Sequence, residues 1–294
     1  MPLVSIADIG SENYIDYLTW AEELKAWYDH FLISDDEDES FDVGWHSGKS
    51  RLPGIHASDL SGCQRKVSYS LLATEKKEMP KAIWKRKFRA GHLYHTMLQR
   101  DFHRMCARTG GAVTFQDEIK VDKTPVAASL DIHSSCDGAF TYLETQGGAP
   151  LLRVATEIKS ASCDEWKNLK EPKPDHIEQA TLYQKCLNIP LIWFIYYNKG
   201  TQAITPSKYP WLRPFDHDVW AKLEVKIHDR FRNRDEGSLP PRQEGIGCEF
   251  CPYSWTCNPK YLSKKRAIEA AKEVRSKTIA ASRLIRAPKI GTPC

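Results

Sequence analysis

The spacing of apolar positions along the chain predicts both helices and strands. Apolar residues recur at helical intervals in four long segments, whereas four shorter segments alternate or are continuously apolar, as strands are. The predicted helices cover residues 12–32, 80–106, 174–188 and 216–234, the second of them interrupted or kinked near Gly91. The predicted strands cover residues 112–121, 129–140, 151–160 and 191–198. A short helix that carries Cys63 is predicted after Ser58, a residue type that often begins helices.

The order of these elements predicts the fold class. Three strands follow a long helix, separated by the turn signals DKTP and TQGGAP, and a helix and a fourth strand come next. This order is typical of an α/β domain in which helices flank a small mixed β-sheet.

Composition narrows the class of protein. The 294 residues include 41% hydrophobic residues and nine tryptophans, which is enough for a globular core. No run approaches the roughly 20 apolar residues that cross a bilayer, and no basic-then-apolar leader opens the chain. We therefore expect no membrane partner and a cytoplasmic location, where cysteines serve as metal ligands or core residues. The odd count of nine cysteines also argues against complete disulfide pairing.

The net charge of +4 hides an asymmetry between the two parts of the chain. Residues 1–50 contain twelve acidic and two basic residues, so the remainder carries +14. A basic body favours a polyanionic partner such as nucleic acid. The acidic run Asp35–Ser40 fits either a solvated loop or a lid that repels or mimics nucleic-acid phosphate. Within the basic helical segment 81–89, Trp84 and Phe88 either stack on bases or pack in the core.

A charged pair in the third predicted strand is the first candidate for chemistry. Glu157 and Lys159 are two residues apart, so a strand points both side chains to one face. Asp137, from the preceding strand, would add a second carboxylate. Asp131 is the alternative, because it is an even number of positions away and would point to the same face of that strand. Two carboxylates from adjacent strands suit a hard cation such as Mg²⁺, and a nearby lysine would orient water or offset phosphate charge. By itself, such a pair is more often an exposed ion pair on an edge strand.

Further residues extend this pattern on both sides. His95 follows Gly91 by four residues, and Gln179 and Tyr183 are four apart on one face of a later helix. Singly, each would be an ordinary packed helix residue. In chain order, however, the motifs G-x-x-x-H, D-G, E-x-K and Q-x-x-x-Y form a set that chance rarely supplies.

Cysteines near the end of the sequence form a second motif. Cys248, Cys251 and Cys257 have the spacing C-x2-C-x5-C, which lacks the fourth ligand of a four-thiolate site. Thiolates bind zinc and iron–sulfur clusters alike, so this chemistry leaves both open. Cys294 ends the chain. The cysteines expected to be small core residues are Cys106, Cys136, Cys163 and Cys186.

Together these motifs resemble the RecB-like branch of the PD-(D/E)XK nucleases, and more narrowly its iron–sulfur-cluster branch. That branch includes the AddB nuclease domain and the CRISPR-associated exonuclease that is the fourth Cas protein. The resemblance covers residues 56–260 and implies a restriction-endonuclease-like core, with an acidic helical arm at 1–55 and a basic helix or tail at 261–294. The segment SGCQRKVSY matches the context of the family's first cysteine, which implies that Cys63 completes a 4Fe-4S site and joins the two ends of the domain.

The resemblance also implies roles for the other motif residues. Lys159 would position the attacking water, and Gln179 and Tyr183 would hold the lysine region and the DNA backbone. The implied ligands of Mg²⁺ or Mn²⁺ are His95, Asp137, Glu157 and the backbone carbonyl of Ile158.

The function expected from these features is a metal-dependent DNA exonuclease. Its substrate would be single-stranded DNA or duplex ends, in recombination, repair or phage DNA processing inside a bacterial or phage-infected cell. The sequence has no P-loop, so a helicase or recombination protein would be a separate partner. Two alternatives remain open: a CRISPR-type protospacer-trimming nuclease, and a non-catalytic DNA-binding subunit that uses the nuclease fold.

Overall fold

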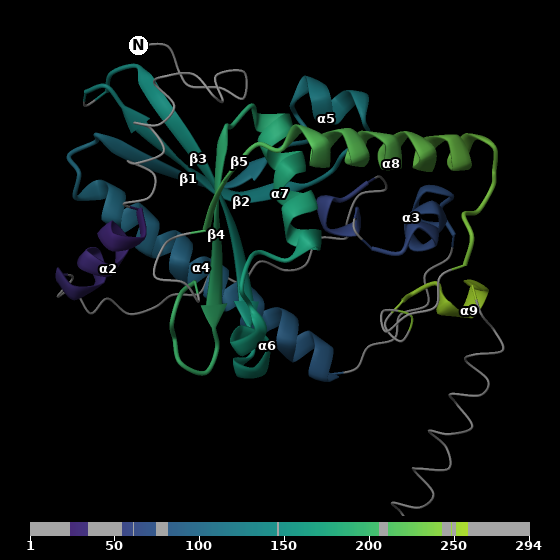
Figure 1. Cartoon of the computed structure of the whole chain (residues 1–294), viewed down its shortest axis with the longest axis horizontal. Helices are drawn as coiled ribbons and strands as arrows, with labels where there is room; N and C mark the ends of the chain where they lie inside the picture. Colours follow the sequence, from purple (N-terminus) through teal and green to yellow (C-terminus); the bar gives the residue numbers. More distant parts are fainter. Residues whose placement is uncertain are drawn as a thin grey trace, which may run out of the picture. The chain divides into compact units, whose positions relative to one another are not determined.

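A computed structural model describes residues 24–34, 55–60, 62–74, 82–145, 147–205, 211–242, 248 and 251–257. The chain divides into two compact units, one formed by residues 1–73 and 80–241 and the other by residues 74–79 and 242–294. The first unit contains the β-sheet, and the second contains the short helix α9 (Ser254–Cys257) (Figure 1). The domain boundaries predicted at residues 55 and 260 stay a prediction.

A five-stranded mixed sheet forms the centre of the first unit. Its spatial order follows the sequence, β1-β2-β3-β4-β5, and only β3 and β4 run parallel. The crossover between these two strands contains a helix, as parallel pairing requires. The mixed sheet that the sequence predicts is therefore confirmed. The strands are β1 (Val113–Lys120), β2 (Ser135–Leu143), β3 (Pro150–Ala161), β4 (Leu191–Asn198) and β5 (Trp211–Pro214).

Helices cover both faces of this sheet, so the first unit has three layers (Figure 1). On one face, Phe102 of α4 (Ala82–Ala107) packs on Phe140 and Trp193, and α2 (Leu24–Ser34) joins the same core. The second core lies on the other face. Its helices include α3 (Gln64–Leu71), α5 (Pro125–Ser129), α7 (Pro174–Leu187) and α8 (His217–Asp235), together with a 3-10 turn at Ala57–Asp59. Because both faces are covered, all eight residues of β4 are buried, which explains its continuous apolar run.

Several predicted boundaries change in the structure. The helix predicted to break near Gly91 is one uninterrupted 26-residue helix, α4. Its second half is anchored in the core by Leu98, Phe102 and Met105, and this packing outweighs the weak helix propensity of one glycine. Cys63 lies outside its predicted helix, as the cap residue before α3 (Gln64–Leu71).

The prediction that the second strand begins at residue 129 is wrong. Thr124 caps α5 by accepting a hydrogen bond from the Ala127 N–H at 3.2 Å, with Pro125 in the first turn. A turn containing Asp131 follows, and β2 begins only at Ser135. Other short elements that escaped prediction include β5 and α6 (Cys163–Asn168), which has a capping box.

The remaining elements agree with the sequence pattern where they are described. The α2 helix confirms the predicted helix from residue 24 onwards, and α7, β4 and α8 lie within a residue or so of their predicted positions. The acidic run Asp35–Ser40 and the tail from residue 261 lie outside the described residues. No helix in the described part of the chain combines the length and the apolar character needed to cross a bilayer.

Candidate active site

A cleft of about 750 Å³ opens in the first unit, beside the end of β1, the start of β2 and the end of β3. Five elements or their ends contribute to its walls: α4, β1, β2, β3 and α7, together with the loop before α3. The predicted site residues that line the cleft are His95, Asp137, Lys159, Gln179 and Tyr183. Glu157 is completely buried behind the cleft wall and forms an ion pair with Lys159, which lines the cleft.

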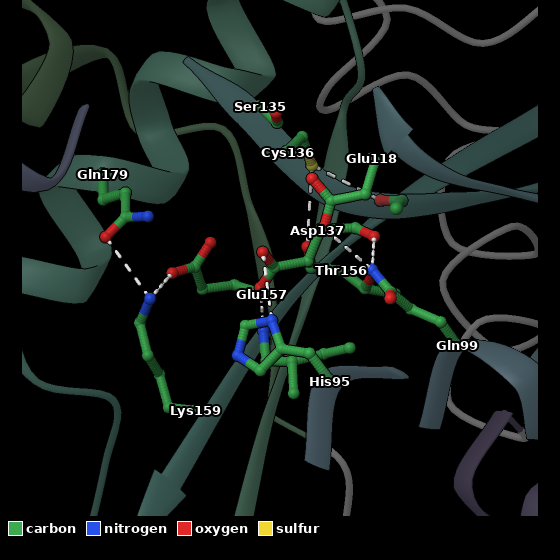
Figure 2. A network of polar contacts seen from close by, with 12 residues as sticks. His95, Gln99, Glu118, Ser135, Cys136, Asp137, Thr156, Glu157, Lys159 and Gln179 are labelled. Carbon is green, nitrogen blue, oxygen red and sulfur yellow. Dashed lines mark hydrogen bonds and ion pairs between the residues drawn. The ribbon is translucent and has the colours of Figure 1, made fainter. Parts of the chain in front are cut away.

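Asp137 lies where the strand pairing ends. The β2–β3 ladder begins at Gly138 and Thr156, one residue inside the sheet. Just beyond this pair, the Asp137 side chain takes the place of a backbone carbonyl as acceptor. Its Oδ2 accepts a hydrogen bond from the Ile158 N–H at 2.6 Å. Its other oxygen, Oδ1, lies 3.6 Å from Nδ1 of His95, which comes from α4 (Figure 2). The splayed strands thus present one carboxylate to an imidazole across the cleft.

The side chains of Glu157 and Lys159 point to the same side of β3 and form an ion pair. Burial raises the pKa of Glu157 to about 8, and Lys159 opposes this shift. Burial also opposes the charged form of Lys159, but Glu157 and Asp137 outweigh it and raise the lysine pKa. An isolated buried carboxylate is costly, so this position favours a bound cation.

Lys159 is also connected to α7. Its Nζ donates to Oε1 of Gln179 at 3.4 Å (Figure 2). Nε2 of Gln179 in turn donates to the Tyr183 hydroxyl at 2.9 Å. The Tyr183 hydroxyl lies 3.2 Å from Oγ of Ser134, and burial raises its pKa well above the ordinary value. Lys159 is therefore held between a carboxylate and an amide, at the end of a polar chain that continues to the segment before β2.

Asp131, the competing carboxylate, does not line this cleft. It adopts a positive φ of 44° in the turn before β2, and its Oδ1 pairs with Nε2 of His133 at 3.1 Å. Asp137 is therefore the aspartate that shares the cleft with Lys159.

The oxygen and nitrogen atoms of the candidate ligands suit a divalent cation, and one of these atoms lacks a partner that a cation could provide. Oε2 of Glu157 is buried and has no hydrogen-bond partner among the described residues. A carboxylate oxygen in that position suits a hard cation, as do the carboxylate of Asp137 and the imidazole of His95. Within the described ranges, however, no three His, Cys, Asp or Glu side chains already form a metal-binding group. The contact between Ile158 and Asp137 is made by the Ile158 amide, and the role predicted for its carbonyl stays a prediction.

The cysteine set spans both units, and its pairing stays a prediction. Cys63, before α3, is half-buried in the first unit. Cys248, Cys251 and Cys257 are also half-buried and follow one another in tight turns of the second unit. The Cys251 N–H bonds to the Cys248 carbonyl at 3.4 Å, and the Cys257 N–H bonds to the Tyr253 carbonyl at 2.9 Å.

The other cysteines largely fit their expected structural role. Cys106, Cys136 and Cys186 are buried, and burial raises the pKa of each thiol, to about 12 for Cys106 and Cys186. Cys163 is exposed at the start of α6, so its assignment to the core is wrong. It begins a short surface helix instead of continuing β3. Cys294 lies outside the described residues.

Two residues of the site escaped sequence analysis. Gln99 is buried on α4, one turn after His95, and its Nε2 donates to the Asp137 carbonyl oxygen at 2.8 Å and to Oε1 of Glu118 at 3.2 Å (Figure 2). Glu118 lies in β1 and lines the cleft. The spacing of four between His95 and Gln99 puts them on one helix face, which is the signal that could have identified the glutamine.

Trp84 and Phe88 have side chains outside the described set, so their proposed contact with bases stays a prediction.

Comparison with protein-family models finds no match, and comparison with curated proteins also finds none. Among solved structures, the chain is similar to SSO0001, with 17% identity and a TM-score of 0.42, over 80% of this chain and 94% of that one. It is also similar to LHK-Exo in complex with dAMP, with 17% identity and a TM-score of 0.42, over 64% of this chain and 91% of that one. A structure of the same alkaline exonuclease, from Laribacter hongkongensis, gives 15% identity and a TM-score of 0.40 over the same shares. At these identities and TM-scores, the similarities assign no activity to this chain.

Proposed function

We propose that this protein is a PD-(D/E)XK nuclease that hydrolyses DNA from its ends with the help of Mg²⁺ or Mn²⁺. The observation that carries the proposal is the cleft network, in which a buried Glu157–Lys159 pair lies beside Asp137 and is connected to Gln179. Two carboxylates and a lysine in one polar cleft are the groups that metal-assisted phosphodiester hydrolysis requires. The choice of an exonuclease over another nuclease comes from the family that the motifs resemble.

The residues of the cleft would divide the work of hydrolysis. His95, Asp137, Glu157 and the Ile158 carbonyl would hold the divalent cation, which would supply Lewis-acid stabilisation of phosphate charge. Lys159, fixed between Glu157 and Gln179, would orient the attacking water and donate a hydrogen bond to a phosphoryl oxygen. The water would add to phosphorus as the P–O bond to the leaving sugar oxygen breaks, and the leaving oxygen would gain a proton. Tyr183 and Ser134 would keep Gln179 in place.

We also propose that Cys63, Cys248, Cys251 and Cys257 hold a 4Fe-4S cluster with a structural role. Support comes from the family resemblance, from the half-buried thiols and from the successive turns that carry the last three. The cluster would close a long loop between the start and the end of the domain. A four-cysteine zinc site is the competing assignment, because thiolates accept both.

The nuclease proposal is tested by cleavage assays with matched variants. Glu157→Gln and Lys159→Met should each lower the cleavage rate on linear DNA by roughly 10²–10⁴-fold, because each removes a group placed at the reacting phosphate. The control pair is Glu178→Gln and Lys226→Met, an ion pair between α7 and α8 that does not line the cleft. Circular single-stranded DNA should resist the wild type if cleavage needs an end. Retained DNA binding without cleavage under either metal would reject the enzyme assignment and favour the non-catalytic alternative.

A further inference from the structure

The strand pairing around Asp137 is interrupted on both of its sides. Between β1 and β2, Cα partners run up to Asp117 and Gly138 and resume at Ile119 and Cys136, and the pair between them is skipped. The skipped residue of β1 is Glu118, which adopts a positive φ of 46°. Towards β3, pairing begins only at Gly138. Asp137 therefore has no Cα partner in either neighbouring strand.

A single side chain, Gln99, fills the gap on the β1 side. Its amide nitrogen carries two protons, and the structure uses both, one for the Asp137 carbonyl oxygen at 2.8 Å and one for Oε1 of Glu118 at 3.2 Å (Figure 2). Gln99 is only 7% exposed, so competition from water is small. The Gln99 amide thus holds the backbone of Asp137 and the side chain of Glu118, two acidic residues that line the cleft.

The other end of Asp137 is held by Ile158, whose N–H donates to Oδ2 at 2.6 Å. Asp137 is thereby fixed at two points, its carbonyl by α4 and its carboxylate by β3. His95, which faces Oδ1 of Asp137, lies one helical turn before Gln99 on the same helix. One rigid helix therefore sets both the imidazole and the backbone position of the aspartate.

We propose that Gln99 is a positioning residue that holds Asp137 in its metal-binding place relative to His95. This inference rests on the proposed function, because it assumes that Asp137 and His95 bind a divalent cation. Gln99 would not touch the ion, and its removal would let the Asp137 backbone relax at a position that has no Cα partner in either neighbouring strand. The loss would then appear as weaker metal binding and not as a lost chemical step.

The test replaces Gln99 by methionine, which has a similar length but no hydrogen-bond donor. Binding of Mn²⁺ is followed by electron paramagnetic resonance, and cleavage is measured over a range of Mn²⁺ concentrations. We expect Gln99→Met to raise the dissociation constant and the half-saturating concentration of Mn²⁺ by roughly 10–100-fold, the usual effect of losing a partner that orients a metal ligand. At saturating Mn²⁺ the cleavage rate should return to within a few-fold of the wild-type rate.

The matched control is Gln184→Met. Gln184 is another buried glutamine on a helix, and its amide donates to the Pro190 carbonyl oxygen at 3.0 Å, away from the cleft. The Gln184→Met variant should lose stability but keep the wild-type Mn²⁺ affinity.

Should Gln99→Met fail to fold, Gln99→His, which keeps one ring N–H, takes its place and should bind Mn²⁺ with intermediate affinity.

The possible results separate this inference from the nuclease proposal. Wild-type Mn²⁺ affinity in a folded Gln99 variant overturns the positioning role, whereas the nuclease assignment stands if the wild type still cleaves. An equal loss of affinity in Gln184→Met also overturns it, because general destabilisation would then explain the effect. A wild type that binds Mn²⁺ but cleaves no DNA overturns the nuclease proposal and leaves the binding comparison valid. A wild type that binds no Mn²⁺ overturns both.

Discussion

Gly138 lies directly against the ring of Phe115. A Cβ atom added at Gly138 would fall 2.3 Å from Cζ of Phe115 and 2.9 Å from the carbonyl oxygen of Gln116, both in the paired strand β1. The strand leaves no room for a side chain immediately after Asp137. The D-G step of the sequence therefore has a packing cause: the glycine lets β1 and its aromatic ring approach the strand that carries the aspartate.

Gly138→Ala should consequently destabilise the protein by about 1–3 kcal/mol, the usual cost of overpacking a core. The shift needed to relieve the contact would also move Asp137, so cleavage should fall with stability. Urea unfolding followed by circular dichroism measures the first effect, and the DNA assay measures the second.

The matched control for that substitution is Gly91→Ala in α4. Apart from the local backbone of α4 itself, no atom of the described chain lies within 4 Å of a Cβ at Gly91, and alanine is the better helix former by up to about 1 kcal/mol. Gly91→Ala should therefore be neutral or stabilising. Equal unfolding midpoints for the two variants would contradict the packing argument.

Arg230 anchors the segment that precedes Cys63. Arg230 is only 1% exposed on α8, and its Nη2 donates to the Leu60 carbonyl oxygen at 2.6 Å, 170 positions away along the chain. Burial lowers the pKa of Arg230, with Asp59 and Glu178 opposing the shift. A buried arginine that binds backbone carbonyls costs desolvation but specifies one position for the loop.

Arg230→Met should destabilise the protein by about 1–3 kcal/mol, because the Leu60 carbonyl would lose its donor in the interior. Arg232→Met on the same helix is the control, since its side chain is 65% exposed and pairs with Asp229 at the surface. Its effect should stay within about 0.5 kcal/mol. Comparable losses in the two variants, measured by urea unfolding, would show that the buried contact does not matter.

The parts of the fold that could be predicted are those whose pattern is set by burial. The apolar run Leu191–Asn198 became β4 because both faces of the sheet are covered, and α7 followed from Pro174 and its helical spacing. The start of β2 was missed because residues 129–134 alternate like a strand, whereas the Thr124 cap and the positive φ of Asp131 turn the backbone first. Local caps and turns decided this boundary against the periodicity.

The candidate site divides in the same way. Glu157 and Lys159 could be proposed because charged residues inside a buried strand stand out in a sequence. Gln99 and Glu118 stand out less, because a polar residue on a helix and an acid in an edge strand both look like solvent-facing positions, and only the spacing of four from His95 points to the glutamine. Only the gap in the strand pairing beside Asp137 gives Gln99 its two acceptors, and that gap is a tertiary feature.

His176 should make stability depend on pH. Its Nδ1 contacts the Tyr196 hydroxyl, which also accepts a hydrogen bond from the Lys173 N–H at 3.0 Å. Burial, followed by the charge of Lys159, lowers the pKa of His176 to about 4 from an ordinary value near 6.5. The folded state therefore keeps this histidine neutral at a pH where the unfolded chain protonates it.

Because the folded pKa is depressed, the contribution of His176 is complete above about pH 6.5 and is lost as the pH falls towards about 4. The slope from one such group is at most about 1.4 kcal/mol per pH unit. His176→Asn should remove this component, so the stability difference between variant and wild type should shrink as the pH falls from 7 to 4. A difference that is constant with pH, measured by urea unfolding, would contradict a neutral buried imidazole.

Cys63 provides the sharpest test of the cluster assignment, because its side chain makes no capping hydrogen bond at the start of α3. Cys63→Ala therefore removes little besides a thiol ligand. We expect the anaerobically purified wild type to be brown, with about four iron atoms per chain and broad absorption near roughly 400 nm. Cys63→Ala should lose most of this iron, whereas the control Cys163→Ala, which removes an exposed thiol outside the set, should retain it. Iron analysis and visible spectra decide the matter. A colourless wild type that contains zinc would replace the cluster with a zinc site, and full iron retention in Cys63→Ala would remove Cys63 from the ligand set.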